Sequence, residues 1–119
     1  MLMLTIRKPQ TEAFRRYGRD QFASEMARHL RAIYPSKTEG ISDQALTKDI
    51  QVGIKKATNY GIRQPFDLQH FLEIRIELGA DFDTNPDMKW ASEILNSSAI
   101  TASEKIDALD DHISFVEVG

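Results

Sequence analysis

The stretch FDLQHFLEIRIELGADFDTNPDMKWASEIL, residues 66–95 of the 119-residue chain, decides the fold because it joins the densest apolar run to the densest acidic turn. From Phe66 to Leu78, apolar side chains recur on more than one side of a helix, as they do in a largely buried helix. Alternation from Leu72 to Leu78 also fits a strand, but the length of the segment and its Gln, His and Glu residues favour a helix. We therefore predict a buried central helix over residues 66–78, ended by Gly79.

Two helices are predicted before the central one. Apolar residues spaced by three to five positions indicate a long amphipathic helix over residues 9–34, followed by a polar linker at residues 35–40. Ser42 is suited to cap a second helix. Gly61 can end that helix in a left-handed conformation, with Ile62 folding back onto its last turn.

Two further helices are predicted after Gly79. Asn85 is suited to cap a short helix, and Thr101 with Glu104 forms a capping-box pattern at the start of the last one. The tail, residues 114–119, is expected to dock as an extended segment or to fray. The predicted fold class is all-α. We expect a compact bundle of about five helices, with a long N-terminal amphipathic helix and a buried central helix, in one helical domain spanning residues 1–119.

The composition is that of an ordinary soluble globular protein, since 41% of the residues are hydrophobic and 28% are charged. The chain has no cysteine, which excludes disulfides, thiolate metal sites and a thiol nucleophile. No run of about 18 consecutive apolar residues occurs, and the first residues lack the features of an export signal. We therefore expect a cytoplasmic protein that does not span a membrane.

The net charge of −3 hides a division along the chain. Residues 1–35 hold seven basic against three acidic groups, and residues 36–66 hold five against three. Residues 67–119 hold three basic against twelve acidic groups, a balance of −9. Either the two ends pack together and neutralise each other, or the opposite charges steer partner proteins into register.

An acidic turn is the best candidate for site chemistry, because oxygen ligands at alternate positions are how a loop wraps a calcium ion. The turn consists of Asp81, Asp83, Asn85 and Asp87. An EF-hand loop needs Gly at position six and Glu at position twelve, whereas Pro86 and Ser92 stand there. The preferred interpretation is that these side chains cap the short helix and interact with basic groups of the first helix. The alternative interpretation is that these side chains contact a partner.

Other chemistries find little support. The three histidines fall on three predicted helices without a close ligand pair, and neither G-x-S-x-G, a P-loop nor G-x-G-x-x-G occurs. Nucleic-acid binding is disfavoured because the sequence pI is about 5.6 and acidic residues share the arginine-rich helix. We therefore predict no enzymatic activity, cofactor or metal. The candidate partner-binding residues are Arg15, Arg16, Arg19, Asp81, Asp83, Asp87 and Trp90.

A combination of short motifs also suggests a family. The start of the chain at residues 3–8 reads MLTIRK, residues 57–62 read ATNYGI, and residues 78–96 read LGADFDTNPDMKWASEILN. In this combination, over nearly the whole chain, the sequence resembles a group of small bacterial accessory proteins encoded beside type VI secretion genes for spike, PAAR-tip and toxin proteins.

The resemblance implies a protein-binding accessory role, as a chaperone, co-chaperone or adaptor for a type VI secreted effector. The expected partner is the effector, an adaptor, or a spike or PAAR component. The alternative is an immunity protein that binds and inhibits a cognate toxin. The resemblance carries no functional residues with it, and the oligomeric state stays open.

Overall fold

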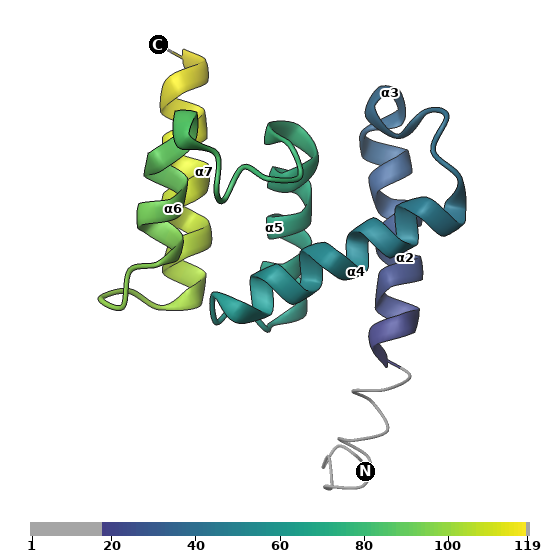
Figure 1. The fold of residues 1–119 in the computed structure, drawn as a ribbon, viewed down its shortest axis with the longest axis horizontal. Coiled ribbons are helices and arrows are strands. Elements are labelled where there is room, and N and C mark those ends of the chain that lie inside the picture. Colours follow the sequence, from purple (N-terminus) through teal and green to yellow (C-terminus); the bar gives the residue numbers. More distant parts are fainter. Residues whose placement is uncertain (1–17, 119) are drawn as a thin grey trace, which may run out of the picture. The chain divides into compact units, whose positions relative to one another are not determined.

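The computed structural model describes residues 18–118, and all regular secondary structure in that range is helical (Figure 1). The elements are α2 (Arg19–Ile33), α3 (Pro35–Thr38), α4 (Asp43–Asn59), α5 (Pro65–Leu78), the 3₁₀ helix η2 (Pro86–Met88), α6 (Lys89–Leu95) and α7 (Ala102–Val118). Within residues 18–118, six α-helices, five of them at least seven residues long, confirm the predicted all-α class with about five helices. No helix in the described range has the length and apolar content needed to cross a bilayer.

The chain divides into two compact units between Lys48 and Asp49, within helix α4. The first unit holds α2, α3 and the first residues of α4, and the second holds the rest of α4 with every later helix. The single domain predicted over residues 1–119 stays a prediction. The first part of the predicted long helix, residues 9–17, lies outside the described residues.

In the first unit, α2 ends where the sequence predicts. The N–H of Tyr34 closes the last turn on the carbonyl of Leu30 at 2.7 Å, before Pro35. The linker predicted at residues 35–40 is wrong in part, because Pro35 opens the one-turn helix α3. A proline suits a first helical position, where no hydrogen bond from its nitrogen is needed. Thr38 stabilises this turn by donating its hydroxyl to the carbonyl of Tyr34 at 2.9 Å, and it is buried.

Arg31 holds the segment after α3 against the end of α2. Its Nη1 donates to the carbonyl of Thr38 at 3.1 Å, and its Nη2 donates to the carbonyl of Ile41. Its Nε donates to Asp43, the first residue of α4, at 3.1 Å. One guanidinium therefore binds two backbone carbonyls and a carboxylate, which joins the connection between α3 and α4 to the end of α2.

Both predicted caps of α4 are confirmed. The Ser42 hydroxyl accepts the N–H of Ala45 at 3.1 Å, which satisfies a donor of the first turn. At the other end Gly61 has φ 87°, and the N–H of Ile62 reaches the carbonyl of Ala57 at 2.9 Å. That is the Schellman arrangement, in which a residue without Cβ takes the left-handed conformation at no steric cost.

Helix α5 supplies the core of the second unit, as predicted for the central helix. Phe71, Leu72 and Ile74 are each at most 3% exposed. The ring of Phe71 lies 5.4 Å from that of Phe82, which follows the predicted stop at Gly79. Phe66 is the exception within this largely buried helix, because it is 68% exposed in the first turn of α5.

Helix α4 approaches α5 closely at a glycine. A Cβ added at Gly53 would lie 2.8 Å from Leu72 Cδ2 and 3.2 Å from the Arg75 side chain. Real Cβ atoms do not approach that closely, so the absence of a side chain at Gly53 permits this packing.

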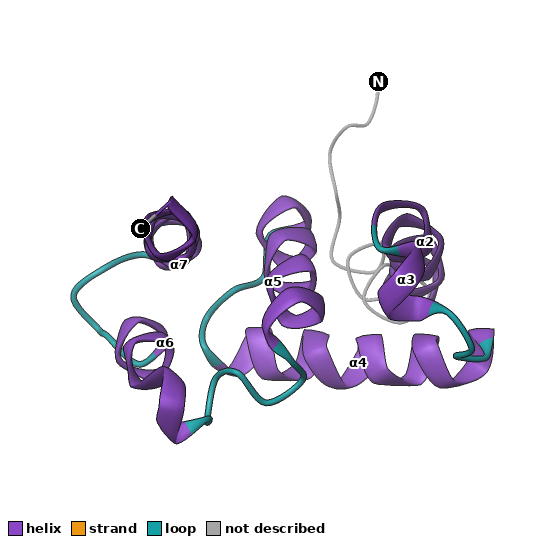
Figure 2. Cartoon of the chain, turned by 90° about the horizontal axis from the view of Figure 1, so that it is seen from above, coloured by secondary structure: helices purple, strands orange, loops and turns teal. Residues whose placement is uncertain are grey.

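Helix α7 packs against both α5 and α6 (Figure 2). It runs parallel to α5, because Ser103 donates to Asp67 at 2.8 Å near the start of both helices and His70 lies 3.9 Å from Asp110 further along. Its buried face includes Leu109, which is fully buried.

Both ends of α7 bear on the sequence predictions. The capping box is confirmed: the N–H of Thr101 donates to Glu104 Oε1 at 2.7 Å, and the N–H of Glu104 donates to Thr101 Oγ1 at 3.1 Å. The prediction of an extended or frayed tail is wrong for the described residues, because α7 continues to Val118.

Replacement of Phe71 by Ala should lower the free energy of unfolding by about 3–5 kcal/mol, because it leaves a cavity at a fully buried position. Phe66→Ala in the same helix is the matched control, and it should cost less than about 1 kcal/mol at a side chain that is 68% exposed. Urea unfolding of both variants measures the difference, and equal losses would contradict the assigned orientation of α5.

Candidate functional site

The acidic turn is held onto α4 by a buried carboxylate. Asp83 is only 3% exposed, and both of its oxygens have partners. Lys56 Nζ donates to Oδ1 at 3.1 Å, and the Tyr60 hydroxyl donates to Oδ2 at 2.7 Å. Lys56 also contacts Asp81 Oδ1 at 3.2 Å. An ammonium and a phenol spaced one helical turn apart therefore pin the turn through charge-assisted hydrogen bonds.

Arg75 secures the same region from α5. It is 6% exposed and forms a two-pronged pair with Asp49, at 2.8 Å to Oδ2 and 3.1 Å to Oδ1. Its Nε donates to the carbonyl of Ala80 at 3.3 Å, and Lys56 reaches that carbonyl at 3.4 Å. The planar fork of an arginine suits this bidentate geometry, which links α4, α5 and the start of the acidic turn.

The surroundings of Tyr60 change its titration. Burial raises the pKa of the Tyr60 phenol to about 12, and the hydrogen bond to Asp83 acts in the same direction. For Lys56, burial lowers the pKa, but the hydrogen bonds and charges of Asp83 and Asp81 together outweigh it and the net shift is upward. Both groups are protonated at neutral pH, and the upward shifts extend their role as hydrogen-bond donors to Asp83 to higher pH.

This geometry revises the interpretation of the acidic turn. The predicted basic partners belong to the first helix, whereas the basic group that contacts the turn within the second unit is Lys56 of the second helix. The hydroxyl of Tyr60, at the end of that helix, is the second donor. The predicted cap at Asn85 is confirmed for the 3₁₀ helix η2, since Asn85 Oδ1 accepts the N–H of Asp87 at 2.9 Å, whereas α6 begins after Met88 without a side-chain cap. Within residues 18–118 no group of three His, Asp or Glu side chains is placed to hold a metal ion.

A second pair of contacts involves two of the histidines. The imidazole of His112 on α7 stacks on Trp90 of α6, with ring centroids 3.9 Å apart and an interplanar angle of 15°. His70 on α5 instead lies beside Asp110 and Phe66. The two histidines therefore contact α7 and its neighbours at separate points: the His112 stack joins α7 to α6, and the His70 contact joins α5 to α7.

The Asp110 carboxyl sits among other acids. Burial raises its pKa, and the charges of Asp107, Glu73 and Asp111 act in the same direction against the opposing effect of His70. Ionised Asp110 therefore carries an electrostatic cost that the weak contact with His70 offsets only in part.

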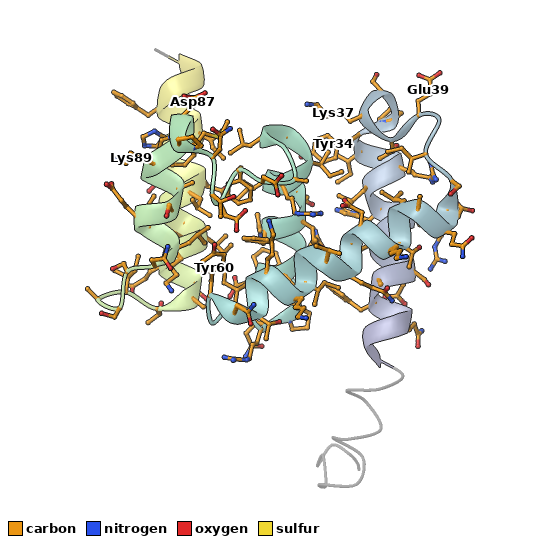
Figure 3. All side chains as sticks on the ribbon, in the orientation of Figure 1. Tyr34, Lys37, Glu39, Tyr60, Asp87 and Lys89 are labelled. Carbon is orange, nitrogen blue, oxygen red and sulfur yellow. The ribbon has the colours of Figure 1, made fainter. Side chains whose placement is uncertain are left out.

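The candidate partner-binding residues fall into three groups. Arg15 and Arg16 lie outside the described residues, and Arg19 begins α2. Asp81 and Asp87 are exposed, and Asp87 lies close to Lys89 at the start of α6 (Figure 3). The remaining two serve the fold: Asp83 is buried in the network with Lys56, and Trp90 is half-buried against His112.

Sequence reasoning missed two exposed aromatic residues, Phe66 and Phe115, which are 68% and 77% exposed. The ring of Phe66 is fixed edge-on against His70, with centroids 4.6 Å apart and an interplanar angle of 76°. Its position directly after Pro65, in the first turn of a helix, was the available signal. Phe115 belongs to the tail at residues 114–119, whose apolar and β-branched residues predict an extended or frayed segment rather than a helix.

Comparisons of the chain with protein-family models, with curated proteins and with solved structures gave no match.

Alkaline pH should destabilise the second unit. The Tyr60 pKa rises from 10.0 to about 12 on folding, so its contribution to stability is complete below pH 10 and is lost as the pH rises toward 12. Tyr60→Phe should remove this part of the loss, which we expect to be roughly 1–2 kcal/mol after solvent screening. Thermal unfolding from neutral to alkaline pH measures it, and an identical alkaline limb in both proteins would contradict the contact with Asp83.

Asp110→Asn should raise the melting temperature at neutral pH. A carboxyl whose pKa is raised by folding destabilises the folded chain once it ionises, so the gain should shrink as the pH falls through that pKa. Glu93→Gln, at an exposed acid of α6, is the control of equal charge change and should give little shift. A loss of stability in Asp110→Asn would show that the contact with His70 outweighs the repulsion.

Proposed function

We propose that this chain is a non-catalytic protein-binding accessory factor, acting as a chaperone, co-chaperone or adaptor for a type VI secreted effector. The secretion context is supported by the combination of motifs at residues 3–8, 57–62 and 78–96, which resembles accessory proteins encoded beside spike, PAAR and toxin genes. The expected partner is a protein of that gene neighbourhood. Binding in the cytoplasm, before export of the effector, belongs to the same proposal.

Phe66 is the observation that carries the binding function. The Phe66 side chain is 68% exposed, and contact of a large aromatic ring with water is unfavourable. A partner that buries this ring therefore gains binding free energy. The edge-on contact with His70 and the 3.3 Å approach of His70 Nδ1 to the Phe66 carbonyl restrict the ring before binding. An anchor that is already ordered costs less entropy when it is buried, as at interface hot spots.

Charge supports the same function by a different route. The twelve acidic and three basic groups of residues 67–119 give this part of the chain a strong negative field. Such a field accelerates encounter with a basic partner and disfavours acidic ones. Exposed Asp81 and Asp87 are candidates for these contacts, whereas Asp83 is buried and instead fixes the acidic turn to Lys56 and Tyr60.

An immunity protein is the second candidate, and the same acidic balance favours it. A toxin with a basic active face would be blocked by a negatively charged surface that covers it. The two functions differ in their effect on the partner: an immunity protein abolishes toxicity, whereas a chaperone raises the level or delivery of an active toxin.

Co-expression with the neighbouring gene products, followed by affinity purification, tests the proposal. Phe66→Ser should weaken recovery of the partner at least about tenfold, as expected for loss of a hot-spot aromatic. Val52→Ser, at another exposed apolar side chain, is the matched control and should retain the partner. Failure to recover any spike, PAAR, adaptor or effector protein with the wild-type chain would contradict the binding function.

A toxicity assay with the recovered partner separates the two candidates. Cells that carry the toxin with and without this chain are compared for growth, and secreted toxin is measured in parallel. Unchanged intrinsic toxicity with increased delivery supports the chaperone, and restored growth supports the immunity protein.

A further inference from the structure

The outer face of α7 is open to solvent, and among the described residues its one hydrogen bond beyond the helix is the capping-box contact of Glu104 with Thr101. Its side chains at spacings of three and four residues, Glu104, Asp107, Asp111 and Phe115, are all exposed. The opposite face of the helix buries Ile106 and Leu109 against the other helices. Because residues three and four apart lie on one side of a helix, the exposed four form a continuous stripe with three carboxylates and one large apolar side chain.

Electrostatics disfavours leaving this stripe uncovered. Within residues 18–118, Asp107 and Asp111 make no ion pair or side-chain hydrogen bond, and their charges act on neighbouring Asp110 as repulsion. Over residues 102–118 five acids face a single basic residue, Lys105, whose Nζ already donates to the carbonyl of Tyr60. A cationic segment laid along the stripe would relieve this repulsion, and an apolar residue beside it would cover Phe115, which is 77% exposed.

The chain itself carries a segment of the complementary chemistry. Residues 1–17 contain four basic groups, Arg7, Lys8, Arg15 and Arg16, against the single acid Glu12. The same segment contains Leu2, Leu4, Ile6 and Phe14 as apolar residues. It lies outside the described residues, and its charge and composition are those of the sequence.

We propose that the outer face of α7 is a self-association surface that receives the basic N-terminal segment of a second copy of this chain. Arg15 and Arg16 pair with Asp107 and Asp111, and apolar residues of the segment cover Phe115. This inference does not depend on the proposed function, since it needs no protein other than the chain. A contact between two different surfaces is heterologous, so it yields a dimer when reciprocated and longer assemblies when it is not.

Sedimentation of the purified full chain over a range of concentrations tests the proposal. At low salt, about 20 mM, the mean mass should rise with concentration, and at about 500 mM salt it should return to that of one chain. Asp107→Lys with Asp111→Lys should weaken association at least about tenfold at low salt. The control Glu39→Lys with Glu93→Lys makes the same change of net charge at exposed acids outside α7, and it should associate like the wild type.

Mixing two variants distinguishes a contact between chains from one within a chain. The Asp107→Lys, Asp111→Lys chain keeps the basic segment, and an Arg15→Glu, Arg16→Glu chain keeps the acidic face. Neither should associate alone, whereas an equimolar mixture should, because each supplies the surface that the other lacks. This result also shows that both variants are folded.

Three outcomes would overturn the proposal. A wild-type chain that stays monomeric at every salt and concentration assigns the face to another occupant, whether a different protein or the same chain. If the control variant loses association as strongly as the α7 variant, the loss is explained by net charge and not by the α7 face. If the mixture remains monomeric while the wild type associates, the association does not come from contact between the N-terminal segment and the α7 face.

Discussion

The second unit depends on a carboxylate that is removed from water. Asp83 is buried, and its charge is tolerated because Lys56 and the Tyr60 hydroxyl each occupy one of its oxygens. Removing one partner from such a group leaves a buried charge without compensation, which is far more costly than the pair is stabilising. The turn after α5 is thereby fixed to α4, and Phe82, next to Asp83, is placed against Phe71 in the core.

Polar contacts and apolar packing therefore act on the same segment. The backbone carbonyl of Ala80 accepts from both Arg75 and Lys56, so the chain leaves α5 in a direction set by two cations. At the next position Asp81 remains exposed while still in contact with Lys56. The Lys56 ammonium therefore contacts both buried Asp83 and exposed Asp81. This shared contact links the exposed part of the turn to its buried part.

The helix α7 shows how a fold can leave a surface for binding. One side is fixed by Leu109 in the core and by the stack of His112 on Trp90. The other side caps the start of the helix through Glu104, and beyond that first turn it keeps exposed carboxylates beside an exposed phenylalanine, Phe115. Exposed Phe66 occurs at the start of α5, on a different helix. These surfaces are formed by helices whose positions are already secured elsewhere, so their side chains are available for contacts.

The sequence by itself determined the helices and most of their ends. Ser42, Gly61 and the Thr101–Glu104 box act through bonds within a few residues, so local chemistry was sufficient to predict them. Tertiary structure alone decided which acids of the turn are structural. Asp81 and Asp83 are two residues apart and both contact Lys56, but only Asp83 is buried, and only Asp83 accepts the hydroxyl of Tyr60 from a distant part of the chain. Burial is a property of the assembled helices, and no local pattern encodes it.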